Sequence, residues 1–122
     1  MLLEGLYQID RFNYTESTVN ATVKLNKDHE IFNGHFPGNP VLPGVCTMQI
    51  IKELTERALD KNLLLSVSSN IKFMALINPE KTPVLDLEIK VSEEVDVIKI
   101  KNTTSFGDTI ALKLSAQYTL AQ

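Results

Sequence analysis

The chain has 122 residues, of which 43% are hydrophobic and 22% are charged, and its formal net charge is −3. The length indicates a single domain over residues 1–122, and the hydrophobic share is large enough for a core, which excludes a disordered chain. The acidic balance argues against a nucleic-acid partner, because proteins that bind phosphate backbones carry a basic surplus.

Neither a signal peptide nor a membrane-spanning helix is predicted. The first ten residues contain no basic region. The longest stretch without Asp, Glu, Lys or Arg, residues 31–51, contains His35 with three prolines and three glycines, which excludes a spanning helix. The single cysteine, Cys46, excludes an internal disulfide and fits a reducing compartment. We therefore expect a cytoplasmic protein with no membrane partner.

Alternating apolar and polar residues predict one strand before the middle of the chain and four strands after it. The clearest alternation covers residues 19–25, 65–73, 85–91 and 110–120. Between Val95 and Ile100 the alternation changes phase, which predicts a β-bulge at that point. Short links at 92–94 and 102–108 predict antiparallel hairpins.

One long helix is predicted, from about Val45 to Asp60. At about 100° per residue, one face is apolar and the opposite face carries Gln49 with three acids. The apolar face holds Thr47, Ile50, Ile51, Leu54 and Ala58, and the acids are Glu53, Glu56 and Asp60. We interpret the acids as a solvated face. Cys46 projects toward the apolar side, so we expect it to be buried in packing.

A single helix covers five or six strands only where the sheet curls around it. The predicted architecture is therefore α+β, an antiparallel five- to six-stranded sheet wrapped around one long central helix. Such a sheet has open edges, and pairing two sheets edge to edge closes one of them. We therefore expect a homodimer with two-fold symmetry.

Glycine and proline are concentrated before the helix. Three of the five prolines and three of the five glycines lie between Gly34 and Gly44. Proline fixes the backbone and glycine frees it, so this stretch predicts a loop with a defined shape instead of a regular element. Loops held in one shape by a rigid scaffold are frequent sites of function.

The loop resembles the signature of the β-hydroxyacyl-acyl-carrier-protein dehydratases. The resemblance rests on HFPGNPVLPGV from His35 to Val45, with support from DHEIFNG before it and from IKFMALINP at 71–79. It covers roughly residues 15 to 120. It implies a hotdog fold, an acyl-carrier-protein thioester as substrate, and loss of water from a 3-hydroxyacyl group.

Dehydration of such a thioester needs a base for the α-proton and donors for the developing oxyanion. His35 is an imidazole on a stiff loop and is suited to the base role. By resemblance, the Gly44 amide at the helix start polarises the thioester carbonyl. We expect Phe36, Pro37, Val45 and Phe73 to line the substrate site. No metal and no cofactor is expected.

Gln49 occupies the position where the family has a glutamate or aspartate. A glutamine hydrogen-bonds to a hydroxyl but cannot deliver a proton, and losing a general acid typically costs about 10²–10⁴-fold. Three alternatives follow. The proton could come from His35 acting twice, from a water held by Gln49, or from Glu53. The reaction could instead be thioester hydrolysis, or the chain could bind the carrier protein without turnover.

Other polar residues have simpler interpretations. His29 lacks a motif, and we interpret it as a surface residue before a short turn. Lys72, Lys99 and Lys101 are either ordinary exposed strand residues or part of a surface that docks an acidic carrier protein. The leading prediction is a dehydratase with His35 as base, Gly44 as oxyanion donor and Gln49 as orienter of a water or hydroxyl.

Overall fold

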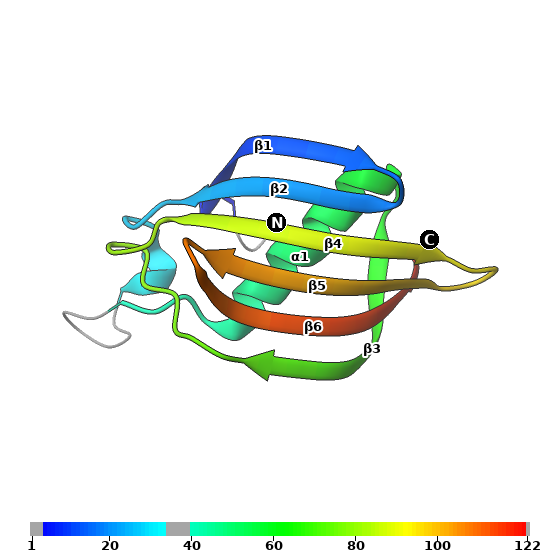
Figure 1. Cartoon of the computed structure of the whole chain (residues 1–122). Helices are drawn as coiled ribbons and strands as arrows, with labels where there is room; N and C mark the ends of the chain where they lie inside the picture. The colour runs from blue at the N-terminus through cyan, green and yellow to red at the C-terminus, as the bar shows by residue number, and fades with distance from the viewer. Residues whose placement is uncertain (1–3, 34–39, 122) are drawn as a thin grey trace.

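Six strands and one long helix make up the fold (Figure 1). The structure is a computed structural model that describes residues 4–33 and 40–121. The elements are β1 (Tyr7–Thr15), β2 (Thr18–Leu25), a short 3-10 helix η1 (Glu30–Phe32), α1 (Gly44–Leu59), β3 (Leu63–Phe73), β4 (Val84–Glu93), β5 (Ile98–Phe106) and β6 (Thr109–Leu120). The strands form one antiparallel sheet in the order β1-β2-β4-β5-β6-β3.

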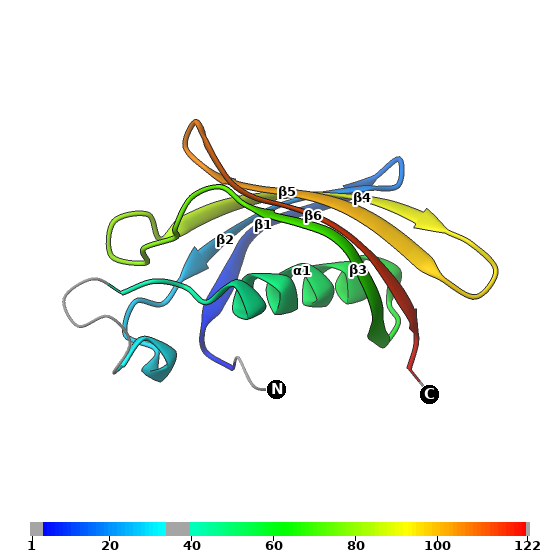
Figure 2. The same ribbon diagram turned by 90° about the horizontal axis from the view of Figure 1, so that it is seen from below.

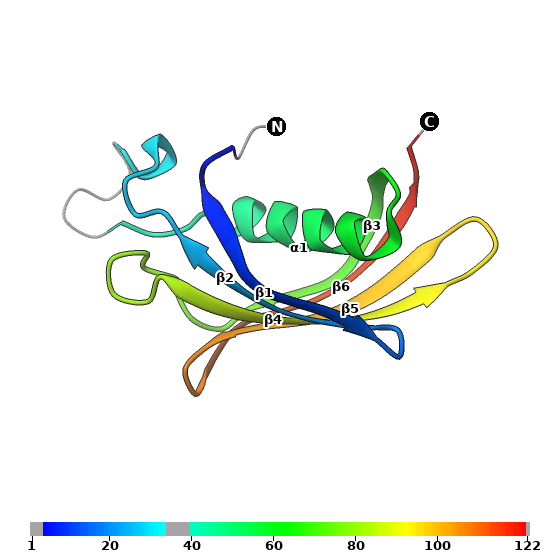
Figure 3. The same ribbon diagram turned by 90° about the horizontal axis from the view of Figure 1, so that it is seen from above.

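The sheet curls around α1, and the helix lies on its concave side (Figures 2 and 3). The inward positions of β2 and β4 alternate strictly with outward ones, and Val19, Val23, Leu85 and Ile89 have no exposed surface. The helix buries Cys46, Thr47, Ile50, Ile51, Leu54 and Thr55 against them. This arrangement is the hotdog fold, which confirms the predicted architecture.

Strand β1 was absent from the sequence prediction, which placed only one strand before the loop. The reason is a register shift between Ile9 and Arg11 in the pairing of β1 with β2. Tyr7 and Ile9 pack against the core before the shift, and Phe12 and Tyr14 do so after it. The extra residue breaks the alternation in two, so neither half is long enough to be recognised.

The predicted bulge between Val95 and Ile100 is wrong. Strand β4 ends at Glu93 and β5 begins at Ile98, so the phase change falls in the connecting turn. The Glu94 N–H donates to the Val97 carbonyl at 2.8 Å and closes this turn. The second hairpin link is also shorter than predicted, because β5 continues to Phe106.

One edge of the sheet is apolar and exposed. In the described part of the chain, β1 and β3 are the two edge strands. Large hydrophobic side chains along β3 and directly after it are about half exposed or more: Leu64, Leu65, Phe73, Met74 and Leu76. An exposed apolar edge strand is an unusual feature of a monomer.

In the part of the chain that the structure describes, no helix is long and apolar enough to cross a membrane.

Candidate active site

The start of α1 leaves a backbone donor open. The N-cap residue is Pro43, whose carbonyl accepts from the N–H groups of Cys46 at 2.9 Å and Thr47 at 3.3 Å. Proline offers no side-chain acceptor, and no side chain caps the helix. Within the described ranges, the Gly44 N–H therefore has no acceptor, as expected for the first turn of a helix.

Gly44 and Phe73 meet at this point. A Cβ atom on residue 44 would lie 2.5 Å from Cε1 and 2.7 Å from Cζ of the Phe73 ring. The Leu42 N–H donates to the Ile77 carbonyl at 2.8 Å and joins the segment before α1 to the segment after β3. The two predicted residues border a hollow of about 360 Å³ whose other walls include Pro43, Thr47, Ala75 and Ala111. A side chain at residue 44 would therefore require the Phe73 ring, which is 61% exposed, to move.

Gly44→Ala should destabilise the protein only while the Phe73 ring is present. The cost should lie below the about 1–3 kcal/mol of overpacking a closed core, because the Phe73 ring is 61% exposed and can turn aside. In a Phe73→Ala background the clash disappears, and alanine in a helix is favoured over glycine by up to about 1 kcal/mol. Urea denaturation of the four proteins should show the effect of Gly44→Ala changing sign between backgrounds. An equal loss of unfolding free energy in both would contradict the contact.

Gln49 lies further along the helix in a second, smaller hollow of about 230 Å³. Val45 lies one turn earlier on the same side, and β3 contributes Leu65. The remaining lining residues are Met48, Lys52, Leu114 and Tyr118. Val45 is 73% exposed, so this hollow opens at the apolar β3 edge. The structure thus pairs Gly44 with Phe73 and groups Val45 with Gln49.

A hydrogen-bonded chain holds the Gln49 side chain. Its amide Nε2 donates to Oε2 of Glu53 at 3.0 Å, and the Tyr7 hydroxyl donates to Oε1 of the same carboxylate at 2.6 Å. Burial raises the pKa of the Tyr7 hydroxyl, and the bond to Glu53 raises it further, so the hydroxyl remains a donor. These hydrogen bonds were not predicted from the sequence, because β1, which carries Tyr7, was not predicted.

The interpretation of Glu53 and Glu56 as solvated was wrong. Both are half-buried. Glu53 has the two donors just described, and an Oε2 atom of Glu56 accepts from the Leu63 N–H at 2.8 Å. The cause is local: β1 places Tyr7 beside the helix, and the chain returns directly from the helix end at Asp60 into β3.

Cys46 is buried with 4% of its surface exposed, as predicted. Burial raises the pKa of its thiol. Because the thiolate is the reactive form, we expect the folded protein to resist an aromatic disulfide reagent at neutral pH and to react fully in denaturant. Spectrophotometric titration with and without urea measures this. Equal rates in both conditions would show that Cys46 is accessible in the folded protein.

The predicted site residues His35, Phe36 and Pro37 lie outside the described residues. His29 is half-buried and caps η1. Its Nδ1 atom accepts from the Ile31 N–H at 3.0 Å, so its Nε2–H donates to the Glu4 carbonyl, also at 3.0 Å. The interpretation of His29 as a plain surface residue is therefore replaced by a structural role.

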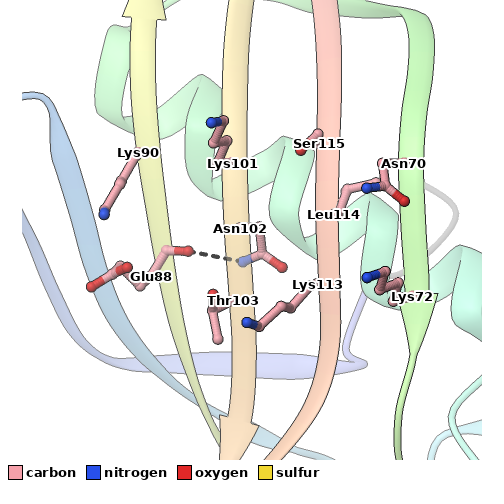
Figure 4. A pocket seen from close by; sticks show the side chains of 10 residues that line it. All are labelled: Asn70, Lys72, Glu88, Lys90, Lys101, Asn102, Thr103, Lys113, Leu114 and Ser115. Atoms are coloured by element: carbon pink, nitrogen blue, oxygen red, sulfur yellow. Dashed lines mark hydrogen bonds between the residues drawn. The ribbon is translucent and has the colours of Figure 1, made fainter.

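The convex face of the sheet carries a lysine-lined hollow of about 270 Å³ (Figure 4). Lys72 on β3 pairs with Lys113 on β6, and Lys90 on β4 pairs with Lys101 on β5. Like charges directly opposite each other destabilise a sheet. These four side chains form no ion pair with any described residue, whereas Lys99 pairs with Glu94 at 3.3 Å. We call Lys72, Lys90, Lys101 and Lys113 the lysine face.

Known proteins resemble this chain over nearly its whole length. A family model described as ApeI dehydratase, ApeI-like, matches residues 11–117. The 3-hydroxyacyl-acyl-carrier-protein dehydratase FabZ of Lactobacillus helveticus is 30% identical over 112 residues, which are 85% of this chain and 74% of that protein. The FabZ of Ligilactobacillus salivarius is 31% identical over 112 residues, which are 84% of this chain and 74% of that protein.

A solved structure shares the fold. The dehydratase heterocomplex ApeI:P from Xenorhabdus doucetiae superposes with a TM-score of 0.74 at 19% identity, covering 92% of this chain and 96% of that one. At this identity the likeness concerns the fold. The match of the family model to most of the sequence, together with the FabZ relatives, shows that this chain belongs to the ApeI-like dehydratase family.

Proposed function

We propose that this dehydratase removes water from a 3-hydroxyacyl thioester carried by an acyl carrier protein. The observation that carries the proposal is the open Gly44 N–H beside Phe73, at the end of the motif that begins with His35. A thioester carbonyl placed there would receive a hydrogen bond at the positive end of the helix dipole.

His35 is the proposed base. It takes the proton from C2, and the electrons of that C–H bond move onto the thioester oxygen held by Gly44. The C3–O bond then breaks, the hydroxyl leaves as water with one added proton, and a C2=C3 double bond remains. Gln49 holds the hydroxyl or a water molecule. Phe36, Pro37, Val45 and Phe73 supply apolar contacts for the acyl chain.

A homodimer joined through the β3 edges is the proposed assembly. The exposed apolar residues of this strand would be covered, and the hollow beside Gln49 would be completed by the partner. Leu65→Glu should therefore give monomers with little activity, while Val95→Glu, at a site 97% exposed in a turn, should change neither property. Sedimentation at micromolar concentration measures this. A monomeric parent protein would contradict the homodimer, and so would dimers that form only with a different chain.

The lysine face is proposed as the surface that docks the acidic carrier. Its four lysines surround one hollow, which Glu88 also lines, on a chain whose net charge is −3. Reversing Lys90 and Lys113 to glutamate should raise KM for carrier-bound substrate and leave KM for a short N-acetylcysteamine thioester unchanged. Unchanged KM for both substrates would remove the lysine face from carrier binding.

The test of the proposed reaction presents three carrier-bound thioesters to the purified protein: 3-hydroxyacyl, trans-2-enoyl and saturated acyl. We expect loss of one water from the first, gain of one water by the second, and no change in the third, all read by mass spectrometry. Free acid from any of them would identify a thioesterase. Binding of all three without conversion would identify a carrier-binding subunit.

The cytoplasm is the proposed location, because Cys46 is the only cysteine.

A further inference from the structure

The orientation of the Gln49 amide is determined by its neighbours. A carboxylate only accepts hydrogen bonds, so the Gln49 atom within 3.0 Å of Glu53 must be the nitrogen. The Glu53 carboxylate cannot turn away freely, because its other oxygen accepts from Tyr7 at 2.6 Å. The planar amide then directs its oxygen, Oε1, away from Glu53. Oε1 has no donor among the described residues.

We propose that Glu53 and Tyr7 are positioning residues that make Gln49 present an acceptor to the substrate. This inference rests on the proposed function. Oε1 of Gln49 accepts the hydrogen of the substrate hydroxyl, which turns a lone pair of that hydroxyl toward the base. An amide donor in this place would instead compete for that lone pair. The residue therefore orients the leaving group and supplies no proton.

The proton for the leaving group then comes from His35. The imidazole removes the C2 proton, becomes an imidazolium, and returns the same proton to the hydroxyl as the C3–O bond breaks. Neutral imidazole and water are the products of this step, so protons and charge balance. Glu53 is not assigned this role, because both of its oxygens already accept hydrogen bonds, one from Tyr7 and one from Gln49.

A reciprocal exchange of the two side chains tests the orientation. Gln49→Glu alone places two carboxylates together and removes the hydrogen bond between residues 49 and 53. We therefore expect kcat to fall about 10-fold or more. Adding Glu53→Gln restores every bond: Tyr7 donates to Gln at 53, which donates to Glu at 49. An oxygen again faces the substrate. The double variant should recover kcat up to the parent value but not above it, with KM nearly constant throughout. A kcat about 10-fold or more above the parent would show that a carboxyl group at 49 donates the proton, and would contradict the orienting role.

Controls separate the possible failures. Glu16→Gln makes the same chemical change at an exposed position in the turn between β1 and β2 and should leave kcat unchanged. Thermal denaturation checks that all variants fold. If the parent converts 3-hydroxyacyl thioesters but the folded double variant is as slow as Gln49→Glu, the positioning role is wrong. If the parent itself forms no enoyl product, the proposed function fails first.

Discussion

His35→Ala is expected to lower kcat/KM for a 3-hydroxyacyl carrier thioester by at least about 10²–10⁴-fold, the usual contribution of a general base or acid. The fall should be at the upper end of this range or beyond it, because His35 is proposed to carry the proton in both directions. Residue 35 belongs to the glycine- and proline-rich loop, so we expect no large core cavity and a stability change well below that of a core truncation.

The chain provides a matched control in its only other histidine. His29→Ala removes the side chain that caps η1, which should cost about 0.5–2 kcal/mol of stability but retain most of the activity. Steady-state kinetics and denaturation on both variants separate chemistry from folding. Comparable activity in His35→Ala and the parent would remove His35 from the base role.

Leu54→Ala is expected to lower the free energy of unfolding by about 2–5 kcal/mol. Leu54 has no exposed surface and lies on the face of α1 that the curled sheet encloses, so the neighbouring strands can close only part of the cavity. The total free energy of unfolding of such a domain is about 5–15 kcal/mol, so the expected loss is a large fraction of it. Urea denaturation at a fixed protein concentration measures it.

Val95→Ala serves as its comparison, because Val95 is 97% exposed in the turn between β4 and β5. Truncation there should stay within about 0.5 kcal/mol. If Leu54→Ala were equally mild, the helix would not be the centre of the core, and the wrapped arrangement would be wrong.

The fold was predictable where one period of alternation extends over a whole strand. β4 has such a pattern, β6 has it from Leu112 to Tyr118, and the broad apolar arc of α1 indicated a helix enclosed by strands. β1 was not predictable, because its register shift near Asp10 divides the pattern. The turn at 94–97 was mistaken for a bulge because both produce the same change of phase.

The site was predictable residue by residue but not contact by contact. Gly44 and Phe73 belong to separate motifs, and only the folded chain shows that a single Cβ would collide with the ring. Gln49 and Glu53 are four residues apart, so their pairing is readable on a helix. Tyr7 also hydrogen-bonds to Glu53, because the curl of the sheet brings β1 beside α1. The opposition of Lys72 and Lys113 depends on strand register, which the sequence pattern left open.

The measurement that tests the dehydratase assignment most directly follows labelled water. The purified protein is incubated with a trans-2-enoyl carrier thioester in oxygen-18 water, and the products are fragmented in a mass spectrometer. We expect heavy oxygen in the 3-hydroxyl group of a thioester that remains attached to its carrier. Heavy oxygen in a released carboxylate, or no incorporation by a folded protein that binds the thioester, would contradict it.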